Sequence, residues 1–146
     1  MSGKKNRKGF TLIEMLVVIA VIAILVSIVI PVVGEYTAKS RAATDAANLR
    51  SVLVALNTEI MLGYDDAEVY IAAMDPLPSK SCPGATLQVV YCIPGIIDVY
   101  YVHDGNYYGM PYFANIAGGG SEVIATTAPS YPAEAVWYEV GVGAIG

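Results

Sequence analysis

The stretch that decides the fold is residues 4–33, KKNRKGFTLIEMLVVIAVIAILVSIVIPVV. A basic leader that ends at Gly9 precedes an apolar run, residues 10–33, in which Glu14 is the one charged side chain. A run of this length is enough to cross a bilayer as a helix, which needs about 20 residues. The positive charges of the leader predict that residues 1–9 stay on the cytoplasmic side and that the rest of the chain emerges on the far side.

A cleavable secretory signal is the common alternative, but its apolar region is shorter, about 7–15 residues, and ends in a small-x-small site. Here the run continues through Pro31 without such a site. A simple anchor has no use for Glu14, since an ionisable residue at mid-bilayer costs on the order of 2.5–3.5 kcal/mol. A cut between Gly9 and Phe10 would place a new α-amino group four residues from Glu14 and so provide a cation.

Residues 9–19, GFTLIEMLVVI, behind their basic leader resemble the prepilin signal of type IV pilins and type II secretion pseudopilins. The resemblance covers about residues 4–33. It implies that a membrane prepilin peptidase cuts after Gly9 and methylates the amine of Phe10. It also implies that the subunit polymerises through its N-terminal helix at an inner-membrane assembly platform, with Glu14 pairing with the amine of a neighbouring subunit.

Pro31 is the second notable residue of the run. It has no N–H to bond the Ser27 carbonyl and clashes with that turn, so we expect the helix to kink or break there. The ordinary alternative is one of the prolines that are common in membrane helices. The resemblance to pilins implies that the helix can stretch at this point in a filament.

Beyond Gly34 the apolar residues recur at spacings of three and four, which predicts an amphipathic helix that ends near Leu62 with Gly63 as its left-handed cap. Its expected core face consists of Ala42, Ala46, Leu49, Leu53, Leu56 and Ile60. The residues expected to be solvent-exposed, fully or in part, are Lys39, Arg41, Asp45, Asn48, Arg50, Asn57 and Glu59.

The remainder predicts a short helix around 69–74 and strands over 87–93, 96–103, 106–110 and 135–142. Asp104-Gly105 is a strong hairpin signal. It pairs His103 with Asn106, Tyr101 with Tyr108, and Val99 with Met110. The predicted fold is α+β and pilin-like, a long N-terminal helix packed on a small antiparallel sheet. Residues 1–9 are then a cleaved leader, 10–33 the membrane and assembly helix, and 34–146 the head.

Composition narrows the setting. The leader holds four of the eight basic residues, so the rest of the chain keeps four against 13 acidic residues, which does not support nucleic-acid binding. Cys82 and Cys92 are the two cysteines, and in an exported chain they favour one disulfide. Cα atoms of a disulfide lie within about 7 Å, and a fully extended strand over 86–92 would hold the two too far apart. Free thiols are the alternative.

Enzymatic, metal and cofactor functions find little support. His103 is alone beside a turn, and we expect it to be solvated. Calcium ligands from Asp65, Asp66 and Glu68, or from Asp104 and Asn106, do not follow the twelve-residue loop pattern. The 11 tyrosines suggest adhesion or electron transfer, but tyrosine is also an ordinary residue of a half-buried sheet, and this second interpretation is the stronger one.

The sequence therefore predicts a structural subunit of an extracellular type IV pilus-like filament. It is made as a single-pass membrane precursor that contacts lipid before assembly and its own copies afterwards. The alternative is a pseudopilin of a type II secretion or DNA-uptake machine, and a weaker one is a surface protein that is never processed.

Overall fold

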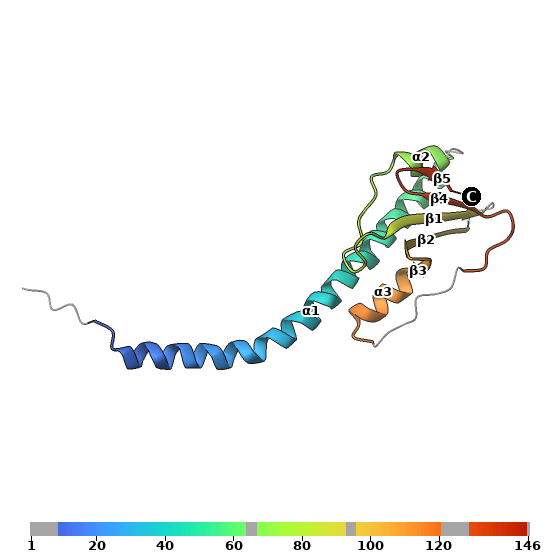
Figure 1. Cartoon of the computed structure of the whole chain (residues 1–146). Coiled ribbons are helices and arrows are strands. Elements are labelled where there is room, and N and C mark those ends of the chain that lie inside the picture. Colours follow the sequence, from blue (N-terminus) through green and yellow to red (C-terminus); the bar gives the residue numbers. More distant parts are fainter. Residues whose placement is uncertain (1–8, 64–66, 93–95, 121–128, 146) are drawn as a thin grey trace, which may run out of the picture. The chain divides into compact units, whose positions relative to one another are not determined.

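The computed structural model describes residues 9–63, 67–92, 96–120 and 129–145. The chain divides into two compact units, Met1–Tyr36 (unit 1) and Thr37–Gly146 (unit 2). The elements, labelled in Figure 1, are α1 (Leu12–Met61), α2 (Ala67–Ala73), β1 (Thr86–Cys92), β2 (Ile96–His103), β3 (Asn106–Tyr108), α3 (Met110–Ala117), β4 (Val136–Glu139) and β5 (Gly143–Ala144). Helix α1 contributes to both units.

Unit 1 consists of the first part of α1, which is apolar on every side and exposed on every side. By length and composition α1 qualifies as a membrane-spanning helix. The helix continues through Pro31, so the predicted helix break at this residue is wrong. A proline removes one N–H from the hydrogen-bond ladder, and apolar helices tolerate that loss.

In unit 2, one face of α1 is buried under the sheet. The fully buried positions follow each other at spacings of three and four and are Ala42, Asp45, Leu49, Val52 and Leu56. Ala46 and Leu53 of the predicted face are only partly buried and flank this row. The expectation that Asp45 stays wet is wrong, since its exposure is 0%.

The sheet is antiparallel with strand order β3-β2-β1-β4-β5. The predicted hairpin is confirmed, because Asp104 and Gly105 have positive φ angles of 49° and 76° and His103 pairs with Asn106. Tyr101 pairs with Tyr108 as expected. The pairing of Val99 with Met110 is wrong, since β3 ends at Tyr108 and Met110 begins α3.

The core joins α1 to one face of the sheet and confirms the α+β class (Figure 1). Val89, Tyr101 and Phe113 bring β1, β2 and α3 to this core, and each is completely buried. Ile71 of α2 joins it as well. Unit 2 therefore has a hydrophobic core of its own.

Asp45 holds the connection between α2 and β1 against α1. Its carboxylate accepts hydrogen bonds from the Ser79 hydroxyl at 2.9 Å and from the backbone N–H groups of Lys80 at 2.7 Å and Ser81 at 2.8 Å. The hydroxyl of Tyr101 donates to the Leu77 carbonyl at 2.8 Å just before this segment. Three donors satisfy a buried carboxylate, and each charge-assisted bond contributes about 1.5–3 kcal/mol.

Replacing Asp45 with Asn should lower the free energy of unfolding of unit 2 by about 2 kcal/mol, because an amide turns a donor toward groups that are themselves donors. The measurement is urea unfolding of the full chain in detergent micelles, followed by the fluorescence of Trp137, the single tryptophan. Asp75→Asn, at an exposed position, is the control. Equal midpoints for the two variants would contradict the role given to Asp45.

Candidate functional site

The bond between Gly9 and Phe10 lies in exposed, non-helical chain immediately before α1. No atom beyond the adjacent residues comes within 4 Å of the position that a Cβ on Gly9 would take. The Phe10 side chain is 80% exposed. The bond is therefore accessible to another protein as far as the described residues are concerned.

Thr11 and Glu14 form a reciprocal cap at the start of α1. The Glu14 carboxylate accepts hydrogen bonds from the Thr11 N–H at 2.8 Å and from the Thr11 hydroxyl at 2.9 Å. The Glu14 N–H in turn donates to the Thr11 hydroxyl oxygen at 3.3 Å. This is a capping box, in which Ser or Thr precedes Glu by three residues and two free N–H groups at the helix end are satisfied together.

The capping box changes the interpretation of Glu14. The sequence predicts a carboxylate that lacks a partner until the leader is cut, whereas the structure gives it two hydrogen bonds from Thr11 within the same chain. Thr11 is the functional residue that sequence reasoning missed. The Thr-x-x-Glu spacing ahead of an apolar run was the signal that could have found it.

One side of this helix start is hollowed. Phe10, Ile13, Glu14 and Val17 are among the residues that line an open depression of about 410 Å³. All its other walls are apolar, so Glu14 provides the one charge of the depression. An apolar partner that carries a positive group is the kind of molecule that such a surface accommodates.

The two cysteines are not joined in the structure. Cys82 has a free, half-buried thiol, and the side chain of Cys92 lies outside the described residues. Strand β1 is extended from Thr86 to Cys92, which spans about 20 Å at 3.3 Å per residue and separates the two residues. Burial and the nearby Asp45 raise the pKa of the Cys82 thiol. A Cys82–Cys92 bridge stays a prediction that this conformation does not favour.

The histidine and the acidic residues do not gather as a metal-ligand cluster in the described part of the chain. His103 lies 3.5 Å from the exposed Asp104 carboxylate at the hairpin turn. No three side chains of His, Cys, Asp or Glu gather as a metal site within the residues that the structure describes. Asp65 and Asp66 fall outside that part.

The tyrosines pack the sheet on both faces. On the face away from α1, the rings of Tyr100, Tyr107 and Tyr131 surround Trp137 with centroid distances of 5.4–6.4 Å. The Tyr131 hydroxyl donates to the Asp98 carboxylate at 2.6 Å and lies 2.6 Å from the Tyr100 hydroxyl. Burial and this donation raise the pKa of Tyr131. These contacts agree with the interpretation of tyrosine as a packing residue of the sheet.

Residues 4–30 match the model of the prokaryotic N-terminal methylation motif. The chain is 37% identical over 61 residues to a fimbrial protein of Pseudomonas aeruginosa, which covers 42% of this chain and 40% of that protein. It is 35% identical over 68 residues to the type IV major fimbrial protein FimA of Dichelobacter nodosus, 47% of this chain and 44% of the relative.

The chain thus spans well under half the length of the curated relatives that it matches. No solved structure was found to match it. The comparisons confirm the resemblance of the N-terminal stretch to type IV prepilins, and the Gly9–Phe10 bond and Glu14 lie inside the matched motif.

Replacing Thr11 with Val should keep the side-chain shape and remove the hydroxyl that caps the Glu14 N–H, while the backbone N–H of residue 11 can still donate to Glu14. Loss of an N-cap costs about 1 kcal/mol, so amide hydrogen exchange at Glu14 and Met15 should become about fivefold faster. The measurement is hydrogen exchange on the full chain in micelles. Thr44→Val is the control, because the Thr44 hydroxyl bonds a carbonyl within α1, at Ser40. Unchanged exchange at Glu14 would contradict the cap.

Proposed function

We propose that this chain is a structural subunit of an extracellular type IV pilus-like filament, cut between Gly9 and Phe10 and polymerised through its N-terminal helix. One observation carries the proposal: an exposed run, residues 10–33, is apolar on all sides, and its single carboxylate, Glu14, lies four residues after Phe10, the residue that follows an accessible bond within a matched methylation motif. Such a surface needs lipid before assembly and other copies of the helix afterwards.

The proposed sequence of events follows from the chain's own groups. The precursor spans the membrane with its leader in the cytoplasm, and prepilin peptidase removes residues 1–9 and methylates Phe10. Helices in lipid associate by close packing and by polar groups that find partners, because the lipid is as apolar as the side chains. The amine of Phe10 then pairs with Glu14 of a neighbouring copy at the assembly platform and sets its depth.

The pilus is favoured over the pseudopilus of a secretion or DNA-uptake machine because the relatives are named as fimbrial proteins. Electron microscopy of sheared cell surfaces separates the two: long filaments that contain this chain support a pilus. Loss of secretion or DNA uptake in a deletion strain, without surface filaments, would favour the alternative.

Processing should leave Phe10 as an N-methylated first residue. Intact-mass analysis of sheared filaments should find chains that begin at Phe10, and Gly9→Leu should trap a membrane-held precursor with residues 1–9 attached. Gly34→Ala is the matched control, since Gly34 is also without close neighbours. Filaments built from chains that retain the leader would overturn the proposal.

Glu14→Gln should be cleaved normally but should reduce filament yield about tenfold, the factor that a lost pairing energy of about 1.4 kcal/mol gives. Glutamine can still close a capping box, so this variant removes the charge and keeps the cap. Glu14→Ala removes both. The measurement is the amount of chain in sheared filaments relative to the cell pellet. Wild-type yield from Glu14→Gln would show that the ion pair is dispensable.

A further inference from the structure

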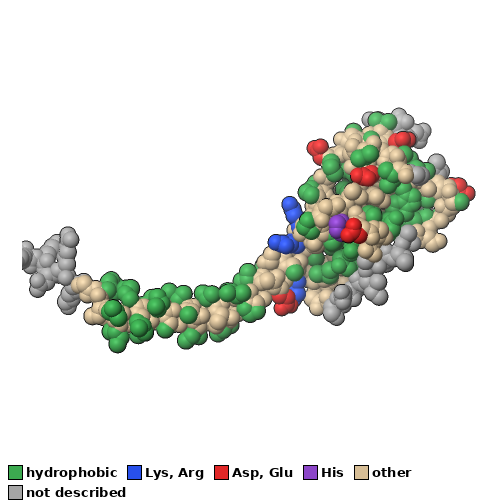
Figure 2. All heavy atoms as spheres, in the orientation of Figure 1, with side chains coloured by type: hydrophobic (Ala, Val, Ile, Leu, Met, Phe, Trp, Pro, Cys, Tyr) green, Lys and Arg blue, Asp and Glu red, His purple; other side chains and the backbone are tan. Residues whose placement is uncertain are grey.

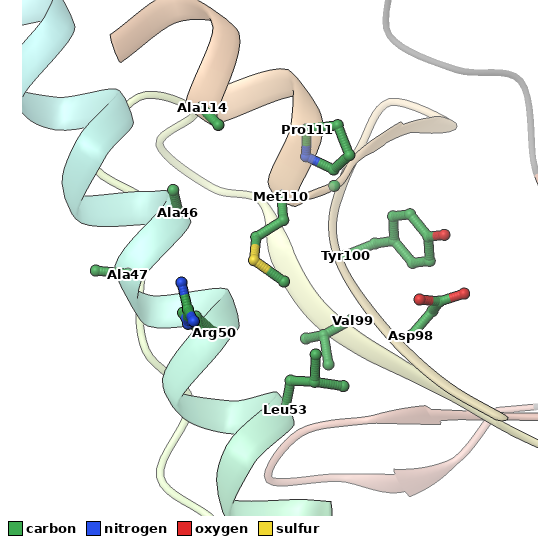
Figure 3. A pocket seen from close by; sticks show the side chains of 11 residues that line it. Ala46, Ala47, Arg50, Leu53, Asp98, Val99, Tyr100, Met110, Pro111 and Ala114 are labelled. Atoms are coloured by element: carbon green, nitrogen blue, oxygen red, sulfur yellow. The ribbon is translucent and has the colours of Figure 1, made fainter. Parts of the chain in front are cut away.

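A groove runs between α1, β2 and the start of α3 in unit 2 (Figure 3). Its volume is about 690 Å³. Its walls are mostly apolar. We call it the Arg50 groove, and the residues that define it are Ala46, Arg50, Leu53, Val99 and Met110. A groove of this size and lining is typical of a binding site.

Arg50 is the charge that the groove offers to a partner. It is exposed on α1, and it makes no ion pair with any of the described residues. The other charged residue of the lining, Asp98, already accepts a hydrogen bond from the Tyr131 hydroxyl at 2.6 Å. Figure 3 shows the Asp98 and Tyr100 side chains directed away from the groove, whereas Met110 reaches into it. The groove therefore suits an apolar surface with one carboxylate.

The same unit carries a carboxylate beside exposed apolar side chains around a shallow open hollow between α2 and β5, and this α2–β5 patch consists of Glu68, Val69, Ala72 and Val142. Val69 is 67% exposed and Val142 is 68% exposed. Glu68 is exposed beside them. In Figure 2, basic side chains gather where α1 enters unit 2, whereas acidic side chains are spread over the unit, including the end that carries α2.

The two surfaces lie at different places along unit 2. Arg50 precedes the end of α1 at Met61 by 11 residues, about 16 Å at 1.5 Å per residue, and α2 follows beyond that end. Two complementary and different surfaces on one chain make a head-to-tail contact, which repeats without closing unless the rotation forms a ring. That geometry is the one that a filament requires.

We propose that the α2–β5 patch of one copy docks in the Arg50 groove of a second copy, with the Glu68 carboxylate paired to the Arg50 guanidinium. The inference rests on the proposed function, because assembly through α1 is what brings the copies together at high local concentration. In this contact, Val69 and Val142 of one copy pack against the apolar walls of the groove in the second copy, which are open to solvent in a single copy.

Cross-linking tests the contact directly. Two full-length chains are co-expressed in a background with Cys82→Ser and Cys92→Ser, one with Arg50→Cys and the other with Glu68→Cys. Sheared filaments treated with a bismaleimide whose length matches the combined Arg50 and Glu68 side chains should contain a link between the two different chains, identified by peptide mapping. The control replaces Arg50→Cys with Arg41→Cys, also exposed on α1 but outside the groove. Absence of the link, or equal linking in the control, would overturn the docking.

Charge exchange tests the pair. Arg50→Glu and Glu68→Arg should each lower the salt concentration at which filaments dissociate and reduce yield about threefold, the size of an exposed ion-pair effect. The double variant should restore both. Glu134→Arg, at an exposed acidic residue outside the patch, is the control. If the wild type forms no filament, the proposed function fails; if it does and the reversals behave like the control, only the docking fails.

Discussion

The buried carboxylate of Asp45 is the constraint on which the globular unit depends. A charge enclosed by protein is costly unless hydrogen bonds compensate it, and here one hydroxyl and two backbone N–H groups do so. Those donors belong to the segment that leads directly into β1, the strand at the centre of the sheet. The position of α1 under the sheet and the entry point of β1 are therefore fixed together. A well-packed apolar residue at position 45 could fill the space, but it would leave two backbone N–H groups without acceptors.

The elements that the sequence predicted well are those with strong local signals. The extent of α1 followed from its periodicity, and the β2–β3 hairpin followed from Asp104-Gly105. The failures have physical causes as well. An analysis of the spacing of apolar residues assigns any carboxylate to the solvent-exposed side of a helix, so it placed Asp45 wrongly. For the same reason the predicted buried face of α1 included Ala46 and Leu53, which are only partly buried. The strand predicted over 106–110 extended too far, because α3 begins at Met110 with Pro111 in its first turn and Gly109 at its N-cap. Phe113 of this helix then packs against Tyr101, with ring centroids 5.9 Å apart.

At the candidate site, the sequence predicts a cleaved bond and a functional carboxylate, and both lie within the matched motif, but it does not predict the hydrogen bonds that Glu14 already has within its own chain. The capping box means that assembly does not rescue a group without partners. In the proposed assembly, the Glu14 carboxylate exchanges hydrogen bonds from Thr11 for an ion pair with an amine from another chain. A cap contributes about 1 kcal/mol, so the proposed exchange is a modest step and would suit a subunit that is stored in the membrane before assembly.

Packing between apolar helices supplies contact area, but it does not fix how far one helix is shifted along the next or how it is rotated about its own axis. The reason is that one side of such a helix is much like another. In the proposed filament, the pairing of Glu14 with an amine distinguishes one depth. It cannot distinguish rotations about the filament axis by itself, since an amine at the right depth satisfies it from more than one direction. The contact that we propose between the globular units, with a charge on each side and apolar side chains around it, would supply that missing choice. In the proposed filament the helix provides most of the buried surface, and the paired charges provide the geometry.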